Sequence, residues 1–221
     1  MKPYGQYCPI TKAAEIVGDR WTIPILRDLL CGTTRFNDLA RGLPRLSRAL
    51  LSKRLRQLVA ADLLRHDGDQ YVLTPAGRAL EPIMFALGEW SATWTFERPM
   101  PSELDTDVLM WWMQQRIDRD RTPDHRIVVQ FVYPDVQRRY WLVIEPDDVS
   151  VCITDPGFDI DVVVTADAST MYEAWLGRID LRDAIAAETI RVDGSPRLAS
   201  AFPGWLLLSP IAYASQRTAA G

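Results

Sequence analysis

The sequence predicts a mainly α-helical domain followed by an α+β domain. Two observations lead to this prediction: apolar residues recur at helical spacing through residues 9–94, and four short stretches rich in β-branched and aromatic residues follow in residues 126–166. Between them, "FERPMPSELD" (96–105) contains two prolines and three acidic residues, as domain boundaries often do. We therefore expect one domain in residues 1–98 and a second in residues 99–221.

The charge of the chain is divided unevenly between these halves. Residues 1–98 hold 14 Lys and Arg against 10 Asp and Glu, whereas residues 99–221 hold 11 against 19, and the whole chain has a net charge of −4. Residues 35–65 contain eight basic residues and only two acidic ones. Such charges often only solvate a surface, but this asymmetry favours different partners for the two halves, one of them polyanionic.

The composition also argues against several classes of protein. No apolar run approaches the ~20 residues that span a bilayer, and the start has no apolar stretch like that of a signal peptide, so we expect a cytoplasmic protein without membrane insertion. The three cysteines are too few and too scattered for a disulfide framework. Two distant histidines, and no metal-ligand spacing, nucleophile motif or phosphate-binding loop, predict no enzyme, no metal and no cofactor.

The first half is expected to fold as four helices, a hairpin and a final helix. Gly18 and Gly32 end the first two helices, Thr33 or Thr34 caps the third, and Ser47 caps the fourth. An Asp-Gly pair at 67–68 is typical of a tight hairpin turn. The expected ranges are 9–18, 19–32, 33–43, 47–58, the hairpin 63–74, and 75–94. This order is that of a winged helix-turn-helix, whose second motif helix enters the DNA major groove.

The helix at 47–58, "SRALLSKRLRQL", carries the positive charge on one side. At 100° per residue, Leu51, Leu55 and Leu58 form a buried stripe. The opposite side is expected to reach base edges, and the flanking arginines, with Arg65 of the hairpin, to reach phosphates. The residues expected to contact DNA are Thr34, Arg35, Ser47, Arg48, Ala49, Ser52, Lys53, Arg54, Arg56 and Arg65.

Residues 8–95 resemble the HxlR-type winged-helix transcription regulators. The matching features are the Cys-Pro opening, Gly-Asp-Arg-Trp, Arg-Phe-Asn-Asp-Leu, Ser-x-x-x-Leu-Ser-x-Arg-Leu and Leu-Thr-Pro-x-Gly. The resemblance implies a homodimer on a pseudo-palindromic operator, with the dimer interface at Leu87, Trp90 and Trp94; alternatively, these aromatics cover the monomer's own core. The wing is short with an acidic tip (Asp67, Asp69), where the family often has a longer, basic loop.

The second half is expected to form an antiparallel sheet covered by helices. The run "DVVVTADASTMYEAWLGRIDLRDAIAAETIRVDG" is similar to sterol-carrier-type lipid-binding domains, and the resemblance covers residues 104–208. It implies an apolar tunnel for an acyl chain or sterol, although aromatics in such a layer more often form core. The candidate pocket residues are Trp112, Phe131, Trp141, Trp175, Phe202 and Trp205.

The sequence therefore predicts a DNA-binding regulator with a C-terminal domain that senses a small apolar or lipid-like ligand. Two alternatives stay open. One is a lipid carrier with a vestigial winged helix. The other is a thiol switch at Cys8, which precedes a helix and lies one turn from Lys12, as a stabilised thiolate requires.

Overall fold

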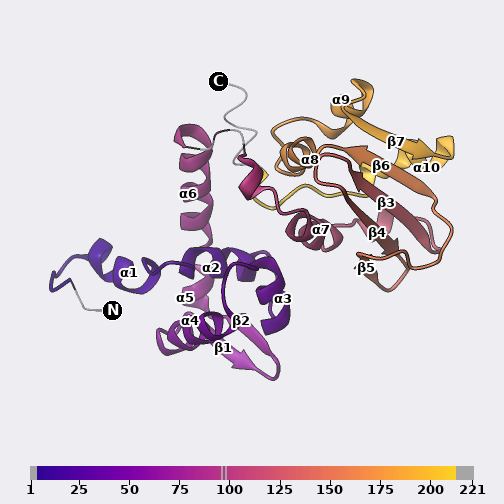
Figure 1. Cartoon of the computed structure of the whole chain (residues 1–221). Coiled ribbons are helices and arrows are strands. Elements are labelled where there is room, and N and C mark those ends of the chain that lie inside the picture. Colours follow the sequence, from indigo (N-terminus) through magenta and orange to yellow (C-terminus); the bar gives the residue numbers. More distant parts are fainter. Residues whose placement is uncertain (1–3, 96, 98, 213–221) are drawn as a thin grey trace. The chain divides into compact units, whose positions relative to one another are not determined.

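The computed structural model describes residues 4–95, 97 and 99–212 (Figure 1). The chain divides into two compact units, residues 1–88 and residues 89–221. No helix in the described part of the chain is long and apolar enough to cross a membrane.

The first unit has the element order expected of a winged helix-turn-helix. Ser47 caps the fourth helix, as expected, and its hydroxyl accepts a hydrogen bond from the backbone N–H of Leu50 at 3.3 Å. Leu64 to Asp67 pair with Leu73 to Gln70, so the hairpin turns at Gly68, which has a φ of 61°. The elements are α1 (Pro9–Val17), α2 (Thr22–Leu30), α3 (Phe36–Gly42), α4 (Arg48–Ala60), β1 (Leu64–Asp67), β2 (Gln70–Leu73), α5 (Pro75–Arg78) and α6 (Glu81–Trp94), and the division between the two units falls within α6.

Two local expectations for this unit were wrong. The single helix expected over 75–94 is interrupted between α5 and α6. Pro82 explains the interruption, because its ring would clash with the carbonyl of Arg78, at which α5 ends. The cap expected at Thr33 or Thr34 is also absent, because α3 starts at Phe36 and its N-cap, Arg35, makes no side-chain capping bond.

The core of the first unit consists of leucine and isoleucine side chains from α2, α3, α4 and the base of the hairpin. Leu51, Leu55 and Leu58 are at most 2% exposed, which confirms the buried stripe predicted for α4. The opposite side of α4 is thereby held toward solvent. The remaining buried members are Ile25, Leu26, Leu29, Leu39, Leu43, Leu46, Leu63, Leu64 and Leu73.

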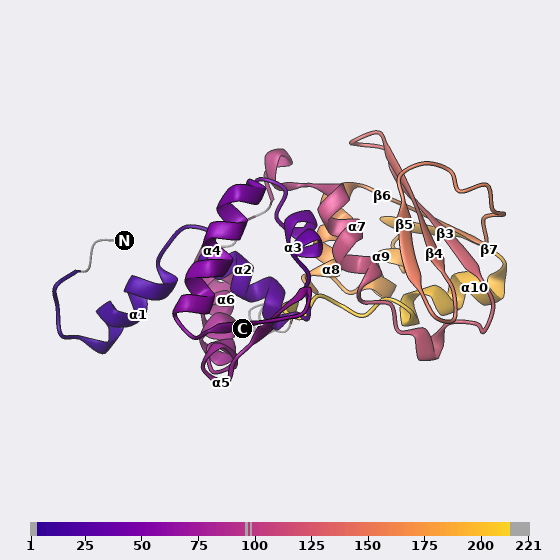
Figure 2. The ribbon, with the colours of Figure 1, turned by 90° about the horizontal axis from the view of Figure 1, so that it is seen from below.

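The second unit is an α+β layer, as predicted, but its sheet is mixed rather than antiparallel. The strand order is β5-β4-β3-β6-β7, and β6 runs parallel to β3 (Figure 2). The parallel pair arises because residues 153–161 form a crossover that returns the chain beside β3 rather than a hairpin. The strands are β3 (Ile127–Tyr133), β4 (Arg138–Ile144), β5 (Val149–Cys152), β6 (Val162–Ala166) and β7 (Ile190–Gly194).

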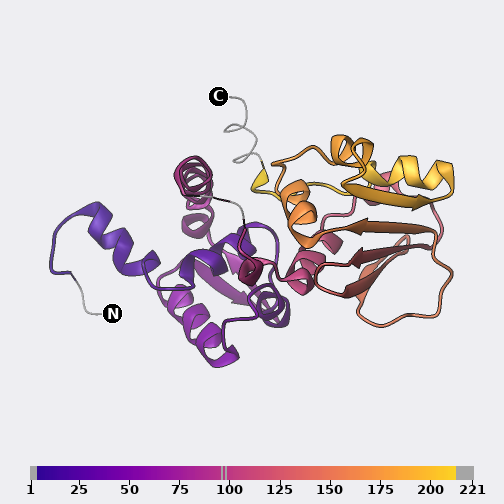
Figure 3. The same cartoon turned by 45° about the horizontal axis from the view of Figure 1, so that its top comes forward.

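The helices of this unit share one apolar core with alternate residues of the strands. Figure 3 shows the orange-to-yellow helices along one side of the sheet. Phe131, Tyr140 and Val164 point into this core, whereas Trp141, which follows Tyr140, lies on the other face of the sheet. The helices are α7 (Thr106–Gln114), α8 (Ala168–Trp175), α9 (Leu181–Ala186) and α10 (Pro196–Ala201), with short 3₁₀ turns at Pro101–Glu103, Arg119–Arg121 and Phe202–Gly204.

Candidate nucleic-acid interface

The outward side of α4 presents the residues expected to reach base edges. Ala49, Lys53 and Arg56 are exposed, and Ser52 is half-buried between them. The Arg56 guanidinium donates a hydrogen bond to the Ser52 hydroxyl at 2.7 Å, so these two side chains form one polar group on the helix surface. Among the described residues Lys53 forms no ion pair, and its ammonium group stays available to a base or a phosphate.

Arg48, at the first turn of α4, is exposed and oriented by neighbouring residues. Its guanidinium donates to the Asn37 side-chain oxygen at 2.6 Å and lies 4.9 Å from the centre of the Phe36 ring. Both partners belong to α3, the helix that precedes α4 in the motif. The contacts hold the charge beside the outward side of α4, where the sequence predicts a phosphate contact.

Arg54 lies in a different environment from the one that sequence register predicts. Its guanidinium is ion-paired with Asp19 in the turn between α1 and α2 and donates to Gln57 at 2.8 Å. Only 14% of its side chain is exposed, so Arg54 joins α4 to that turn and is not part of the exposed basic surface. Helical register placed it at the edge of the basic side but could not show that another turn covers that edge.

The wing holds two further arginines through its acidic tip. Arg35 pairs with Asp69 at 3.1 Å, and Arg65 pairs with Asp67 at 3.5 Å, with all four side chains largely exposed. Thr34 is also bonded to the wing, because its backbone carbonyl accepts a hydrogen bond from the Tyr71 N–H at 2.8 Å. The sequence signal for these pairs was present in the two acids of the turn, but their partners were not predicted.

The predicted dimer-interface residues lie on a helix without buried residues. Leu87, Trp90 and Trp94 of α6 are 42%, 55% and 73% exposed. They therefore do not cover the core of the described chain, which was the alternative interpretation. Helix α1 likewise has no buried residue and exposes Ile10.

Cys8 is half-exposed and occupies the N-cap position of α1. Hydrogen bonds from the backbone N–H and the hydroxyl of Thr11, and from the backbone N–H of Ile10, lower the pKa of its thiol below the usual range. Lys12, the cation expected to assist, pairs instead with Glu15 at 3.0 Å. The helix start, rather than a neighbouring cation, therefore stabilises the thiolate.

In the second unit, most of the residues proposed to line a ligand tunnel are packed core. Phe131, Trp175, Phe202 and Trp205 are at most 2% exposed. The Phe202 ring lies edge-on to those of Phe131 and Trp205, with centroids 6.0 and 6.1 Å apart. Trp112 packs against the same core from its periphery. These five residues fill the space between sheet and helices.

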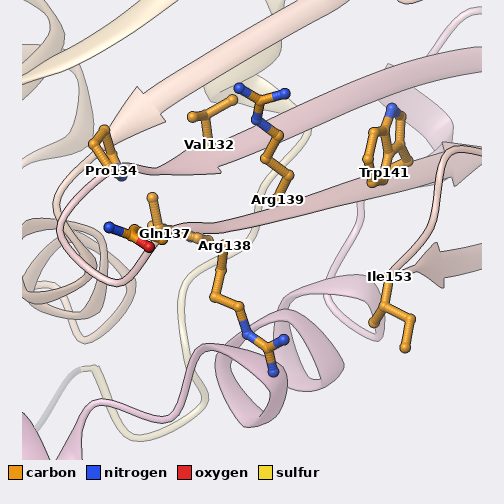
Figure 4. A pocket seen from close by; sticks show the side chains of 8 residues that line it. Val132, Pro134, Gln137, Arg138, Arg139, Trp141 and Ile153 are labelled. Carbon is orange, nitrogen blue, oxygen red and sulfur yellow. The ribbon is translucent and has the colours of Figure 1, made fainter.

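Trp141 is the exception, because it lines a pocket of about 550 Å³ at the turn end of the β3–β4 hairpin (Figure 4). The apolar lining comes from Val132, Pro134, Trp141 and Ile153. The sheet is open here because β5 pairs only with Trp141–Ile144 and leaves the edge of β4 before Trp141 without a β5 partner.

Four further residues complete the lining of this pocket, namely Tyr133, Gln137, Arg138 and Arg139. Figure 4 shows Arg139 and Trp141 on one side of β4 and Arg138 on the other, directed toward a helix. Arg138 pairs with Asp107 of α7 at 2.8 Å. Among the described residues, no cluster of His, Cys, Asp and Glu could hold a metal ion.

Comparisons with known proteins place the first unit in a family. Residues 16–99 match the family described as HxlR-like helix-turn-helix. Over 97 residues the chain is 34% identical to "Uncharacterized HTH-type transcriptional regulator YvaP" of Bacillus subtilis, a match that covers 40% of this chain and 90% of that protein.

Two solved structures are each similar to part of the chain. The quinone-bound YodB from B. subtilis is 28% identical, with a TM-score of 0.37, and the match covers 38% of this chain and 97% of YodB. "UbiJ-SCP2 Ubiquinone synthesis protein" is 19% identical, with a TM-score of 0.33, over 62% of this chain and 98% of that one, a likeness of fold alone. On the sequence match with YvaP and the family match of residues 16–99, this chain belongs to the HxlR-like helix-turn-helix family.

Proposed function

We propose that the protein is a cytoplasmic, non-enzymatic transcription regulator that binds a pseudo-palindromic DNA operator as a homodimer. The observation that carries the proposal is the outward side of α4, which presents Ser52, Lys53 and Arg56 on the second helix of a helix-turn-helix. Arg and Lys at that position pair with guanine, and the Ala49 methyl suits the methyl group of thymine. Arg48 contacts phosphate beside them.

The dimer brings two copies of α4 to successive major grooves, one DNA turn of ~34 Å apart. The exposed apolar residues of α6 support it, because Trp90 and Trp94 would lose unfavourable contact with water in an interface. Two symmetric half-sites also multiply specificity, since each mismatched base pair costs ~1–3 kcal/mol.

The test is fluorescence anisotropy of the full chain on DNA from upstream of its own gene, against random duplex, at two salt concentrations. We expect specific binding that weakens steeply with salt, because phosphate contacts release counterions. The double substitution Lys53→Ala and Arg56→Ala should remove the preference for the operator while leaving weak general binding. Equal losses on operator and random duplex would contradict the base-reading role of α4.

We further propose that the second unit senses a small apolar ligand and thereby changes DNA affinity. The pocket at Trp141 supports this, since its size falls within the range of small-molecule sites. Only a ligand that binds the DNA-competent and incompetent states with different affinity can shift the equilibrium. A ligand that binds tightly to a chain without specific DNA binding would favour a carrier over a regulator.

A thiol switch at Cys8 is a second candidate because hydrogen bonds from α1 lower the pKa of its thiol. A greater thiolate fraction at neutral pH makes the sulfur more reactive toward oxidants. We expect Cys8 to be alkylated by iodoacetamide at lower pH in the native protein than in the Thr11→Val variant, measured by peptide mass spectrometry. If Cys8→Ser and the native protein lose DNA affinity equally after oxidation, the switch does not operate.

A further inference from the structure

Two polar groups at the β3–β4 pocket have no partner within the described residues. The Arg139 guanidinium is exposed and forms no ion pair or hydrogen bond there, whereas the neighbouring Arg138 is paired with Asp107. The indole N–H of Trp141 is buried and has no hydrogen-bond acceptor, although the residue lines the pocket. The exposed guanidinium of Arg139 is therefore the donor of this pair that a ligand in the pocket can reach, whereas the indole contributes its ring as an apolar surface.

The walls around these groups are apolar and partly accessible. Trp141 is 8% exposed and Ile153 is 70% exposed. Val132 and Pro134 also contribute apolar surface to the lining. Val132 lies on the same side of β4 as Arg139 and Trp141 (Figure 4). An apolar body could therefore lie against the indole and the side chains of Val132 and Ile153, with its polar end toward the guanidinium.

The charge balance of the site favours a ligand with one negative charge. Asp107 already neutralises Arg138, and Arg138 points to the other side of the strand, so Arg139 is the available cation of the pocket. Residues 99–221 carry 19 acidic against 11 basic residues, and this surplus of negative charge disfavours a dianion such as phosphate. A carboxylate matches both the single charge and the planar fork of the guanidinium.

We infer that the β3–β4 pocket binds a small apolar carboxylate, with Arg139 as its counter-ion and Trp141 and Ile153 as its apolar contacts. This inference rests on the ligand-sensing part of the proposed function and names the chemical class of its ligand. It also moves the site from the space between sheet and helices, which aromatic side chains fill, to the opposite face and open edge of the sheet.

The experiment is calorimetric titration of the full chain with 2-naphthoate and with 2-naphthalenemethanol, which has the same ring system without the charge. We expect the carboxylate to bind and Arg139→Gln to weaken it by about tenfold or more, since the variant loses a charge-assisted hydrogen bond. The alcohol should bind more weakly and be unaffected by Arg139→Gln. Arg182→Gln, which removes an exposed arginine of α9, is the matched control.

A second variant keeps the test independent of Arg139. Ile153→Glu places a negative charge at an exposed wall of the pocket and should abolish naphthoate binding while sparing the alcohol. Naphthoate binding that is indifferent to both Arg139→Gln and Ile153→Glu would overturn the inference. Absence of binding by both 2-naphthoate and octanoate would also overturn it.

Failure of the pocket and failure of the regulator give different results. Anisotropy on operator DNA, with and without saturating naphthoate, measures the coupling of the two units. Naphthoate binding without a change in DNA affinity would support the proposed ligand site but contradict the proposal that the ligand controls DNA binding. Specific DNA binding without binding of either naphthoate or octanoate would contradict the proposed pocket but not the proposed DNA-binding function.

Discussion

Three basic residues of one helix, Lys53, Arg54 and Arg56, differ in what their charges contact. Lys53 and Arg56 are exposed, whereas Arg54 is largely buried beside Asp19 and Gln57. Sequence register separates the apolar from the polar side of α4 because the period of the helix is known. It cannot distinguish an arginine that faces solvent from one that a distant turn covers.

We expect Arg54→Ala to destabilise the first unit by about 1–3 kcal/mol, because it removes a partly buried charged hydrogen bond and leaves Asp19 without its partner. The measurement is the midpoint of urea unfolding. Arg56→Ala, on the exposed side of the same helix, should change stability by less than about 0.5 kcal/mol. The prediction would be wrong if Arg54→Ala were as stable as the native protein but bound all DNA sequences more weakly. Arg54 would then contact phosphate, as the sequence predicts.

A second residue-scale prediction concerns Asp28, whose carboxyl is 4% exposed and has one oxygen without a partner. Burial raises its pKa, although Arg27 opposes this. The folded state therefore binds the proton more readily than the unfolded state, and the resulting stabilisation is present at low pH and lost as the pH rises through the raised pKa.

Asp28→Asn removes this titration. We expect the variant to gain stability relative to the native protein as the pH rises from 4 to 7, measured by urea unfolding at each pH. Asp62→Asn, which removes an exposed carboxyl in the same unit, is the control for the loss of one negative charge. A stability difference that is constant over this range would show that Asp28 titrates alike in both states.

At the scale of elements, the wing combines two arginines suited to phosphate with two acids that hold them. The pairs Arg35–Asp69 and Arg65–Asp67 are exposed, so each contributes little to stability. They nevertheless place negative charge beside the cations that DNA would contact. The wing should therefore weaken general DNA binding.

We expect the double substitution Asp67→Asn and Asp69→Asn to tighten binding to random duplex and to steepen the salt dependence, with a change of up to about 2 in the log–log slope if both arginines reach phosphates. Anisotropy over a salt series measures this. Asp62→Asn serves as the control for a change in net charge alone. An unchanged slope in the wing variant would show that Arg35 and Arg65 do not contact DNA.

The elements themselves were largely predictable from sequence. Gly18 and Gly32, Ser47 and the Asp-Gly turn act through local backbone chemistry, which a sequence displays directly. The break before α6 was missed although Pro82 signals it. The parallel pairing of β3 with β6 was missed because a crossover and a hairpin connection differ in path rather than in composition.

At the scale of the whole molecule, the exposed apolar residues of α6 predict self-association. We expect Trp90→Ser with Trp94→Ser to convert a dimer into a monomer in sedimentation equilibrium, because the interface would lose two large aromatic contacts. Operator binding should weaken with it, since a monomer contacts one half-site. Ile153→Ser, which removes an exposed apolar side chain outside α6, should remain dimeric. A native protein that is monomeric at micromolar concentration and on DNA would contradict the homodimer.

The winged-helix order, the buried stripe of α4 and the α+β class of the second domain were all predictable from the sequence alone. These follow from hydrophobic periodicity and turn chemistry, which act over a few residues. Which charged side chains remain available depends on contacts between segments that are distant in the sequence. Asp19 engages Arg54, Asp67 and Asp69 engage the wing arginines, and Asp107 engages Arg138, while Arg139 stays without a partner among the described residues. The tertiary structure also places most candidate pocket aromatics in the core, because packing density depends on which faces of distant segments meet.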